Sequence, residues 1–176
     1  MCGRYTLAHP AKINEHYGAG TLGDTELSPN FNVAPGHSMP VVVDVEGENH
    51  VRMMKWGLVP SWAKEAKIGY KMINARSEGI EAKPSFRHAF KSQRCLVPAS
   101  GFYEWKKTQE GKTPYFIELP TKEMYAFAGI WNSWKDREGK EFNAYSIMTS
   151  DPNAEMKFVH DRMPVILHKE DEQKWL

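Results

Sequence analysis

The chain has 176 residues, of which 41% are hydrophobic and 26% charged, with a formal net charge of +1. This composition indicates one globular domain over residues 1–176, with enough length to bury a core. Without a chain-wide excess of basic residues, a DNA partner would have to bind a local patch. No apolar run is long enough to span a membrane and no signal peptide is evident, so we expect a cytoplasmic protein without membrane contact.

The first half of the chain predicts one short helix and a hairpin. Residues 5–18 contain a short helix candidate with Pro10 near its start and Gly18 as its stop, and residues 19–30 favour a loop. Residues 41–43 and 51–58 predict two strands joined by a turn at residues 47–49. The chain then leaves the second strand through a loop that carries Trp62 near its tip.

The second half predicts a basic helix over residues 86–95 and strands at 95–98, 101–105, 115–119, 125–131 and 144–148. Asp151 followed by Pro152 is typical of a helix start, with the helix running over residues 155–159. The six or seven short strands and three short helices lack β-α-β alternation. This order favours an α+β fold with a mainly antiparallel, strongly curved sheet.

Cys2 stands where removal of Met1 would make it the first residue, with a free amine and a thiol on neighbouring carbons. Such a pair attacks an aldehyde and closes a five-membered thiazolidine ring. Unperturbed amino termini and thiols titrate close enough to neutrality for both groups to react. The dipeptide alone is better explained as a start codon followed by an arbitrary cysteine. The two cysteines, Cys2 and Cys95, form neither a disulfide framework nor a zinc-spaced set.

Glu104 lies in the predicted strand 101–105, where alternation puts it on the same face as Phe102. If that face is inward, burial favours the protonated carboxyl group and suits it to proton transfer. Burial statistics favour the opposite orientation, with Tyr103 and Trp105 inside and Glu104 in water.

His160 follows the predicted helix 155–159, and a helix C-terminus favours a protonated imidazole that can exchange protons near neutral pH. Asn74 is compatible with a helix N-cap or with a polar role in a site. Arg76 and Arg162 could clamp phosphates or form surface ion pairs. Trp62 could stack on a base or fold back onto the core.

Six blocks, taken in order, resemble the SOS response-associated peptidase (SRAP) family across nearly the whole chain. They are Cys2-Gly3-Arg4, Asn32-Val33-Ala34-Pro35-Gly36, Trp56-Gly57-Leu58-Val59-Pro60, Asn74-Ala75-Arg76-Ser77-Glu78, Gly101-Phe102-Tyr103-Glu104-Trp105 and His160-Asp161-Arg162-Met163-Pro164.

The resemblance implies an SRAP-like α+β fold with a curled, barrel-like sheet, and a monomer that shields abasic sites in single-stranded DNA by covalent attachment. The sequence has no Cys/His cluster and no Gly-rich phosphate loop, so we expect no cofactor and no metal. The resemblance assigns a nucleophile role to Cys2, an orienting role to Asn74, and acid/base roles to Glu104 and His160. It also implies that the following residues contact DNA: Arg4, Asn32, Trp62, Arg76 and Arg162.

Two departures from the family pattern stand out. Ala63 replaces a second aromatic residue beside Trp62, and family members usually continue beyond Leu176, so we expect a truncated or short member. Two other functions are compatible with the same residues. One is a thiol peptidase with Cys2 as nucleophile and His160 as base. The other is a DNA-binding module without catalysis, which leaves Cys2 and Glu104 unexplained.

Overall fold

The computed structural model describes residues 2–20 and 27–176. The described strands are β1 (Arg4–Leu7), β2 (Asn30–Val33), β3 (Ser38–Val45), β4 (Glu48–Trp56), β5 (Asn74–Arg76), β6 (Arg94–Ala99), β7 (Gly101–Thr108), β8 (Gly111–Ile117), β9 (Tyr125–Lys135), β10 (Glu141–Ser150) and β11 (Met163–Pro164). The α-helices are α1 (Ile13–Tyr17), α2 (Arg87–Ser92) and α3 (Glu172–Trp175), and the 3₁₀ turns are η1 (Pro10–Lys12), η2 (Ala66–Lys71), η3 (Ile80–Ala82), η4 (Met156–Phe158) and η5 (Lys169–Asp171).

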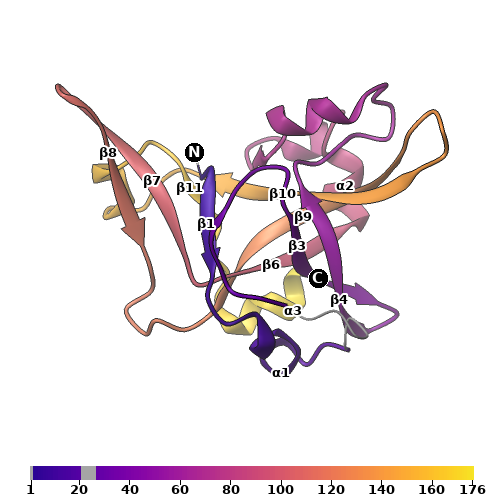
Figure 1. The fold of residues 1–176 in the computed structure, drawn as a ribbon, viewed down its shortest axis with the longest axis horizontal. Coiled ribbons are helices and arrows are strands. Elements are labelled where there is room, and N and C mark those ends of the chain that lie inside the picture. The colour runs from indigo at the N-terminus through magenta and orange to yellow at the C-terminus, as the bar shows by residue number, and fades with distance from the viewer. Residues whose placement is uncertain (1, 21–26) are drawn as a thin grey trace.

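Five strands close into a barrel in the order β10-β4-β3-β6-β9, because β9 pairs again with β10 (Figure 1). Only the β4–β10 junction of this ring is parallel, and the other four are antiparallel. Closure removes the exposed sheet edges of an open sheet. The expected α+β fold with a curved, mainly antiparallel sheet is therefore confirmed.

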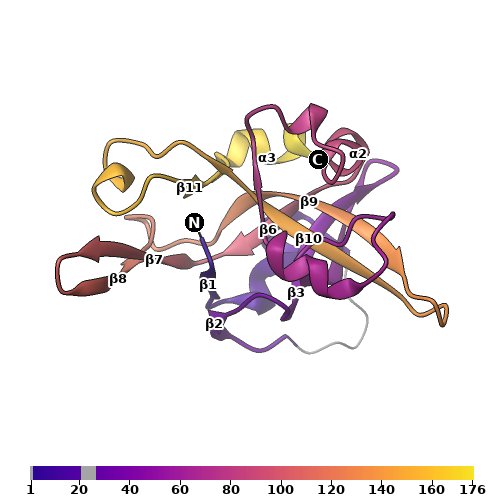
Figure 2. The same cartoon turned by 90° about the horizontal axis from the view of Figure 1, so that it is seen from above.

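Two barrel strands, β3 and β9, contain apolar runs that are buried on both faces. Residues 39–43 of β3 and 125–130 of β9 are buried without alternation, as strands become when they are covered on both sides. Gly129 permits the close approach of β9 to β6, since a Cβ there would lie 2.7 Å from Cys95 Sγ and from Val97 Cγ2. Helices α2 and α3 pack against β6 and β9 (Figure 2).

A second sheet, in the order β2-β1-β7-β8, joins the barrel beside the N-terminus. In both views the β7–β8 hairpin projects from one end of the molecule, and the β9–β10 hairpin projects from the opposite end (Figures 1 and 2). Tyr5 of β1 inserts into the barrel, where its hydroxyl lies 2.8 Å from that of Tyr145. This buried pair joins the two sheets at the point where the chain begins.

The short helix expected within residues 5–18, with Pro10 near its start and Gly18 as its stop, is confirmed as η1 and α1, and residues 4–7 before it form β1 between β2 and β7. The helix expected after Asp151 is only η4, whose Met156 N–H is capped by Asn153 Oδ1 at 2.8 Å. Four short strands, β1, β2, β5 and β11, were not predicted. Within residues 2–20 and 27–176, no helix has the length and apolarity needed to cross a membrane.

Candidate active site and nucleic-acid interface

Cys2 is fully buried beside strand β7. The β1–β7 register pairs Arg4 with Tyr103, so Cys2 comes two residues before the first pair of this ladder. The N-terminal end of β1 accordingly lies between β7 and β11 (Figure 1). Burial, followed by the negative charge of Glu104, raises the pKa of the Cys2 thiol from 9.0 to about 12. Met1 lies outside the described residues, so its removal stays a prediction.

Asn74 holds the backbone of Cys2. Its Nδ2 donates a 2.8 Å hydrogen bond to the Cys2 carbonyl oxygen, across 72 residues of sequence. Asn74 opens β5, which pairs in parallel with β10, so its position is set by the barrel and not by a helix start. The N-cap interpretation is therefore wrong. The buried Asn74 Oδ1 has no hydrogen-bond partner among the described residues and can accept one from an amine.

Glu104 is buried, with 3% of its surface exposed, on the same face of β7 as the buried Phe102. The orientation favoured by burial statistics, with Glu104 in water, is therefore wrong. The η4 turn and the loop after it bring His160 to this carboxylate, with His160 Nε2 4.0 Å from Glu104 Oε1. The Cys2, Asn74, Glu104 and His160 side chains come from four separate segments, and their direct contacts connect Asn74 with Cys2 and His160 with Glu104.

Two contacts meet at Nδ1 of His160. The backbone N–H of Arg162 donates a 3.1 Å hydrogen bond to it, and Asp161 Oδ1 lies 2.7 Å from the same atom. A neutral ring that accepts the Arg162 N–H carries its own hydrogen on Nε2, the atom that faces Glu104. His160 can therefore give a proton at the side that faces Glu104.

The residues expected to contact DNA divide into two groups. Arg4, Asn32, Trp62 and Arg76 are at least partly exposed. Arg4 Nη1 donates a 2.7 Å hydrogen bond to Asn32 Oδ1 across the β1–β2 pair, which links these two predicted contacts. Trp62 is 58% exposed, so it does not fold back onto the core.

Arg162 forms the second group alone, because it is 8% exposed and its guanidinium is engaged with the protein. Its two Nη atoms bond both carboxylate oxygens of Glu78, at 2.8 and 2.9 Å. They also reach Asp151 Oδ1 and the Thr149 carbonyl oxygen, each at 2.8 Å. The pKa of Glu78 is held at about 2 by this guanidinium. Arg162 thereby ties the loop of His160 to β10 and to the segment after β5, and offers DNA no open phosphate clamp.

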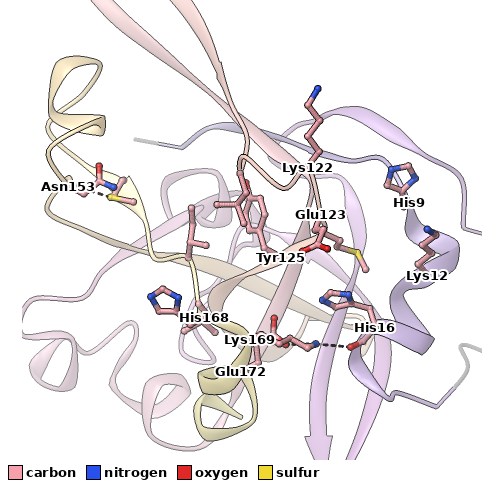
Figure 3. A pocket seen from close by; sticks show the side chains of 15 residues that line it. His9, Lys12, His16, Lys122, Glu123, Tyr125, Asn153, His168, Lys169 and Glu172 are labelled. Atoms are coloured by element: carbon pink, nitrogen blue, oxygen red, sulfur yellow. Dashed lines mark hydrogen bonds and ion pairs between the residues drawn. The ribbon is translucent and has the colours of Figure 1, made fainter.

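A separate hollow of about 770 Å³ lies between α1, the start of β9 and the η5 region (Figure 3). Its lining includes His9, His16, Tyr125 and His168, and Lys169 Nζ donates to the His16 carbonyl oxygen at 2.7 Å. None of the predicted site residues lines it. In the described part of the chain, no group of three or more His, Cys, Asp or Glu side chains could hold a metal ion.

Sequence reasoning missed Asp161 and Glu78 as supports of the site, and four lysines beside it. The adjacency of Asp161 to His160 was visible in the sequence, but the contact of Glu78 with Arg162 spans 84 residues and left no local signal. Pairing the predicted strands 101–105 and 115–119 as a hairpin, which was not predicted, would have shown that Lys106, Lys107 and Lys112 gather near Glu104.

Fold and site together define a small α+β protein with a buried cysteine at the second position, supported by amide, carboxylate and imidazole side chains. The chain belongs to the SOS response associated peptidase (SRAP) family, whose family model matches residues 1–176.

Two relatives and one solved structure illustrate the similarity. Abasic site processing protein YoqW of Bacillus subtilis (strain 168) is 43% identical over 179 residues, which cover 100% of this chain and 80% of YoqW. Abasic site processing protein HMCES of Gallus gallus is 35% identical over 187 residues, covering 88% of this chain and 56% of that protein. A crystal structure of a Bacteroides thetaiotaomicron protein superposes with a TM-score of 0.90 at 31% identity, covering 99% of this chain and 81% of the other.

Proposed function

We propose that this protein processes abasic sites in single-stranded DNA by forming a covalent thiazolidine crosslink through Cys2 after removal of Met1. The relatives named above are called abasic site processing proteins. The observation that carries the proposal is the arrangement around Cys2, whose carbonyl is held by Asn74 and whose thiol is influenced by the buried Glu104. An amine and a thiol on adjacent carbons can react with the same aldehyde carbon and close a thiazolidine ring, so an aldehyde substrate would require both groups.

The first chemical step opens the abasic sugar, which exists mostly as a closed hemiacetal. Opening breaks the bond between C1′ and the ring oxygen, moves a proton from the C1′ hydroxyl to a base, and delivers a proton to the ring oxygen. Protonated His160 supplies the latter proton from Nε2. Glu104, 4.0 Å away, accepts the former. Acid–base help of this kind contributes about 10²- to 10⁴-fold in rate.

In the second step, the Cys2 amine forms a bond to C1′ of the aldehyde. The resulting carbinolamine takes a proton on its hydroxyl from His160 or Glu104 and loses water, which leaves an iminium. Asn74 Oδ1 is an acceptor for the amine hydrogens, while Asn74 Nδ2 keeps the Cys2 carbonyl in place. If Met1 is retained, the Cys2 nitrogen is an amide and cannot attack.

In the third step, Cys2 Sγ forms a bond to C1′, the carbon–nitrogen π electrons return to nitrogen, and the thiol proton passes to Glu104. With Met1 still attached, burial and Glu104 raise the pKa of the Cys2 thiol to about 12, which disfavours the thiolate and supports an order in which the amine attacks first. Ring closure also removes the iminium, which would otherwise promote β-elimination and strand cleavage. In the product, the DNA strand is therefore unbroken and the protein is covalently attached at the abasic site.

Single-strand binding rests on the exposed members of the predicted interface. Arg4 and Arg76 would neutralise phosphates, and Asn32 would orient the Arg4 guanidinium through its 2.7 Å bond. Trp62, 58% exposed, would stack on a base or wedge against a duplex end. Arg162 acts through position: it anchors the loop that carries His160.

The experiment compares crosslink yield to one abasic oligonucleotide among four proteins on a denaturing gel. They are the mature protein, a form with one extra residue before Cys2, Cys2→Ser and Cys2→Ala. We expect a stable crosslink only with the mature protein, and a borohydride-reducible Schiff base at most with the two substituted forms. Cys95→Ala is the matched control, since Cys95 is also a fully buried thiol.

The outcomes separate the alternatives. A thiol peptidase would lose activity in Cys2→Ala and tolerate the extra residue, and a binding module would tolerate every change. If the extended form crosslinks as well as the mature protein, the amine-first mechanism is wrong. If an undamaged oligonucleotide crosslinks as well as the abasic one, the aldehyde is not the target.

A further inference from the structure

A groove of about 600 Å³ opens beside the candidate active site, between the β7–β8 hairpin and the loop around η4. Glu104 and His160 both line it, so a molecule in the groove lies against the reacting groups. Lys106 follows Glu104 by two residues on the same face of β7, which places the two about 7 Å apart along the strand. The groove therefore continues the site outward.

Four lysines line this groove: Lys106, Lys107, Lys112 and Lys157. Among the described residues, the carboxylates that line it are Glu104 and Asp161. Lys107 and Lys112 are direct partners in the β7–β8 ladder, where like charges opposite each other are destabilising. Among the described residues, no ion pair joins any of the four lysines to an acidic side chain. The fold thus keeps a concentration of positive charge that its own acidic residues do not neutralise.

An exposed aromatic ring lies within this positive charge. Phe158 is 63% exposed, and Lys106 Nζ lies 3.0 Å from the centre of its ring. Tyr115 meets the same ring edge-on, with ring centres 6.2 Å apart, and fixes its orientation. Cations beside an accessible aromatic face are the combination that binds single-stranded nucleic acid, through phosphate contacts and base stacking.

We propose that this lysine groove holds the phosphates that flank the abasic nucleotide, with a neighbouring base stacked on Phe158. The inference rests on the proposed function and adds the route of the strand away from the lesion. DNA is favoured over an acidic protein segment because the aromatic ring is exposed among the lysines, and because the groove opens onto Glu104 and His160.

The test measures non-covalent binding to an oligonucleotide that carries a tetrahydrofuran abasic analogue, which has no aldehyde. Binding is followed by fluorescence anisotropy over a range of salt concentrations, for the wild type and for Lys107→Ala/Lys112→Ala/Lys157→Ala. The matched control removes three positive charges at the opposite end of the molecule: Lys135→Ala/Arg137→Ala/Lys140→Ala, at the β9–β10 hairpin (Figure 1).

We expect the groove variant to bind more weakly and to lower the slope of log K against log salt by about 2, since each single-strand phosphate contact contributes about 0.7. The control should change the slope by less than half of that. Phe158→Ala should weaken binding without changing the slope. Equal slope changes in both triple variants, or an unchanged slope in the groove variant, would overturn the proposal. If only binding of a polyglutamate peptide is lost, the groove takes an acidic protein segment instead.

A second measurement separates this proposal from the proposed function. With a true abasic oligonucleotide at limiting protein, the groove variant should crosslink more slowly than the wild type, and the β9–β10 control variant should match the wild type. Absence of a crosslink with the wild type would refute the proposed function while leaving the salt slopes interpretable. Equal crosslinking by the groove variant and the wild type at limiting protein would overturn the groove proposal. Thermal unfolding of each variant checks that the fold is retained.

Discussion

The buried thiol of Cys2 allows a quantitative test of the amine-first mechanism. In the protein that retains Met1, burial and Glu104 raise the thiol pKa from 9.0 to about 12. Each pKa unit is a tenfold change in the thiolate fraction at pH values below both pKa values. The folded protein should therefore hold about 10³-fold less thiolate than the unfolded chain at pH 7.5. Because the thiolate is the nucleophile, alkylation should slow by at least this factor.

The assay uses iodoacetamide and intact mass on Met1-retaining Cys95→Ala protein, so that Cys2 is the only thiol. The rate constant is measured at pH 7.5 in buffer and in urea sufficient to unfold the chain, with a cysteine-containing peptide in both solutions to correct for the urea. We expect a folded-to-unfolded ratio of about 10⁻³ or lower. A ratio above about 10⁻¹ would mean that the thiol is accessible and ionised, and the order of the two bond-forming steps would have to be reversed.

Three further predictions concern the residues around Cys2. Glu104→Gln and His160→Ala should each slow crosslinking by about 10²- to 10⁴-fold in a quenched time course, with unchanged thermal unfolding, because they remove proton transfer and little packing; normal rates in both would remove the acid/base roles. Arg76→Ala should lower the salt slope of single-strand binding by about 0.7, and an unchanged slope would exclude Arg76 from the interface. Arg162 depresses the folded-state pKa of Glu78, so the ionised carboxylate stabilises the wild type above pH 4.5 and this contribution is lost as the pH falls toward 2. Glu78→Gln should lack the contribution, so the difference in free energy of unfolding between wild type and variant should shrink from pH 5 to pH 2. A difference in urea unfolding that stays constant over this range would contradict the prediction.

Glu104 illustrates what a local pattern can and cannot predict. Alternation correctly put Glu104 on the face of Phe102, but it gave no means to decide which face is inward. The decision depends on β1 and on the loop of His160, which are about 100 and 56 residues away in sequence. General burial statistics pointed outward because they describe glutamates that lack such partners. No local property of the strand suggested an acid/base role for Glu104. That role was expected from the resemblance of the six ordered blocks to the SRAP family, and the burial of Glu104 is compatible with it.

The strands that the sequence did not predict share one physical cause. Segment 4–7 forms β1 only because β2 and β7 lie on either side of it, and both partners are distant in sequence. Strand propensity reflects such surroundings more than the residues themselves. The β3–β4 hairpin was predicted because its partners are adjacent and its valines are continuous. Asn74 was read as a possible cap for the same reason: its partners, Cys2 and β10, were not visible locally.

The pairing of β1 with β7 also determines how long the N-terminus stays exposed during synthesis. Arg4 lies opposite Tyr103, so the strand that covers Cys2 leaves the ribosome about 100 residues after Cys2 does. At about 5–20 residues per second, that delay lasts about 5–20 s. During this interval the start of the chain is still exposed, and an aminopeptidase can remove Met1 from it. Translation speed therefore bears on how much of the protein acquires a free N-terminal amine before β7 encloses Cys2.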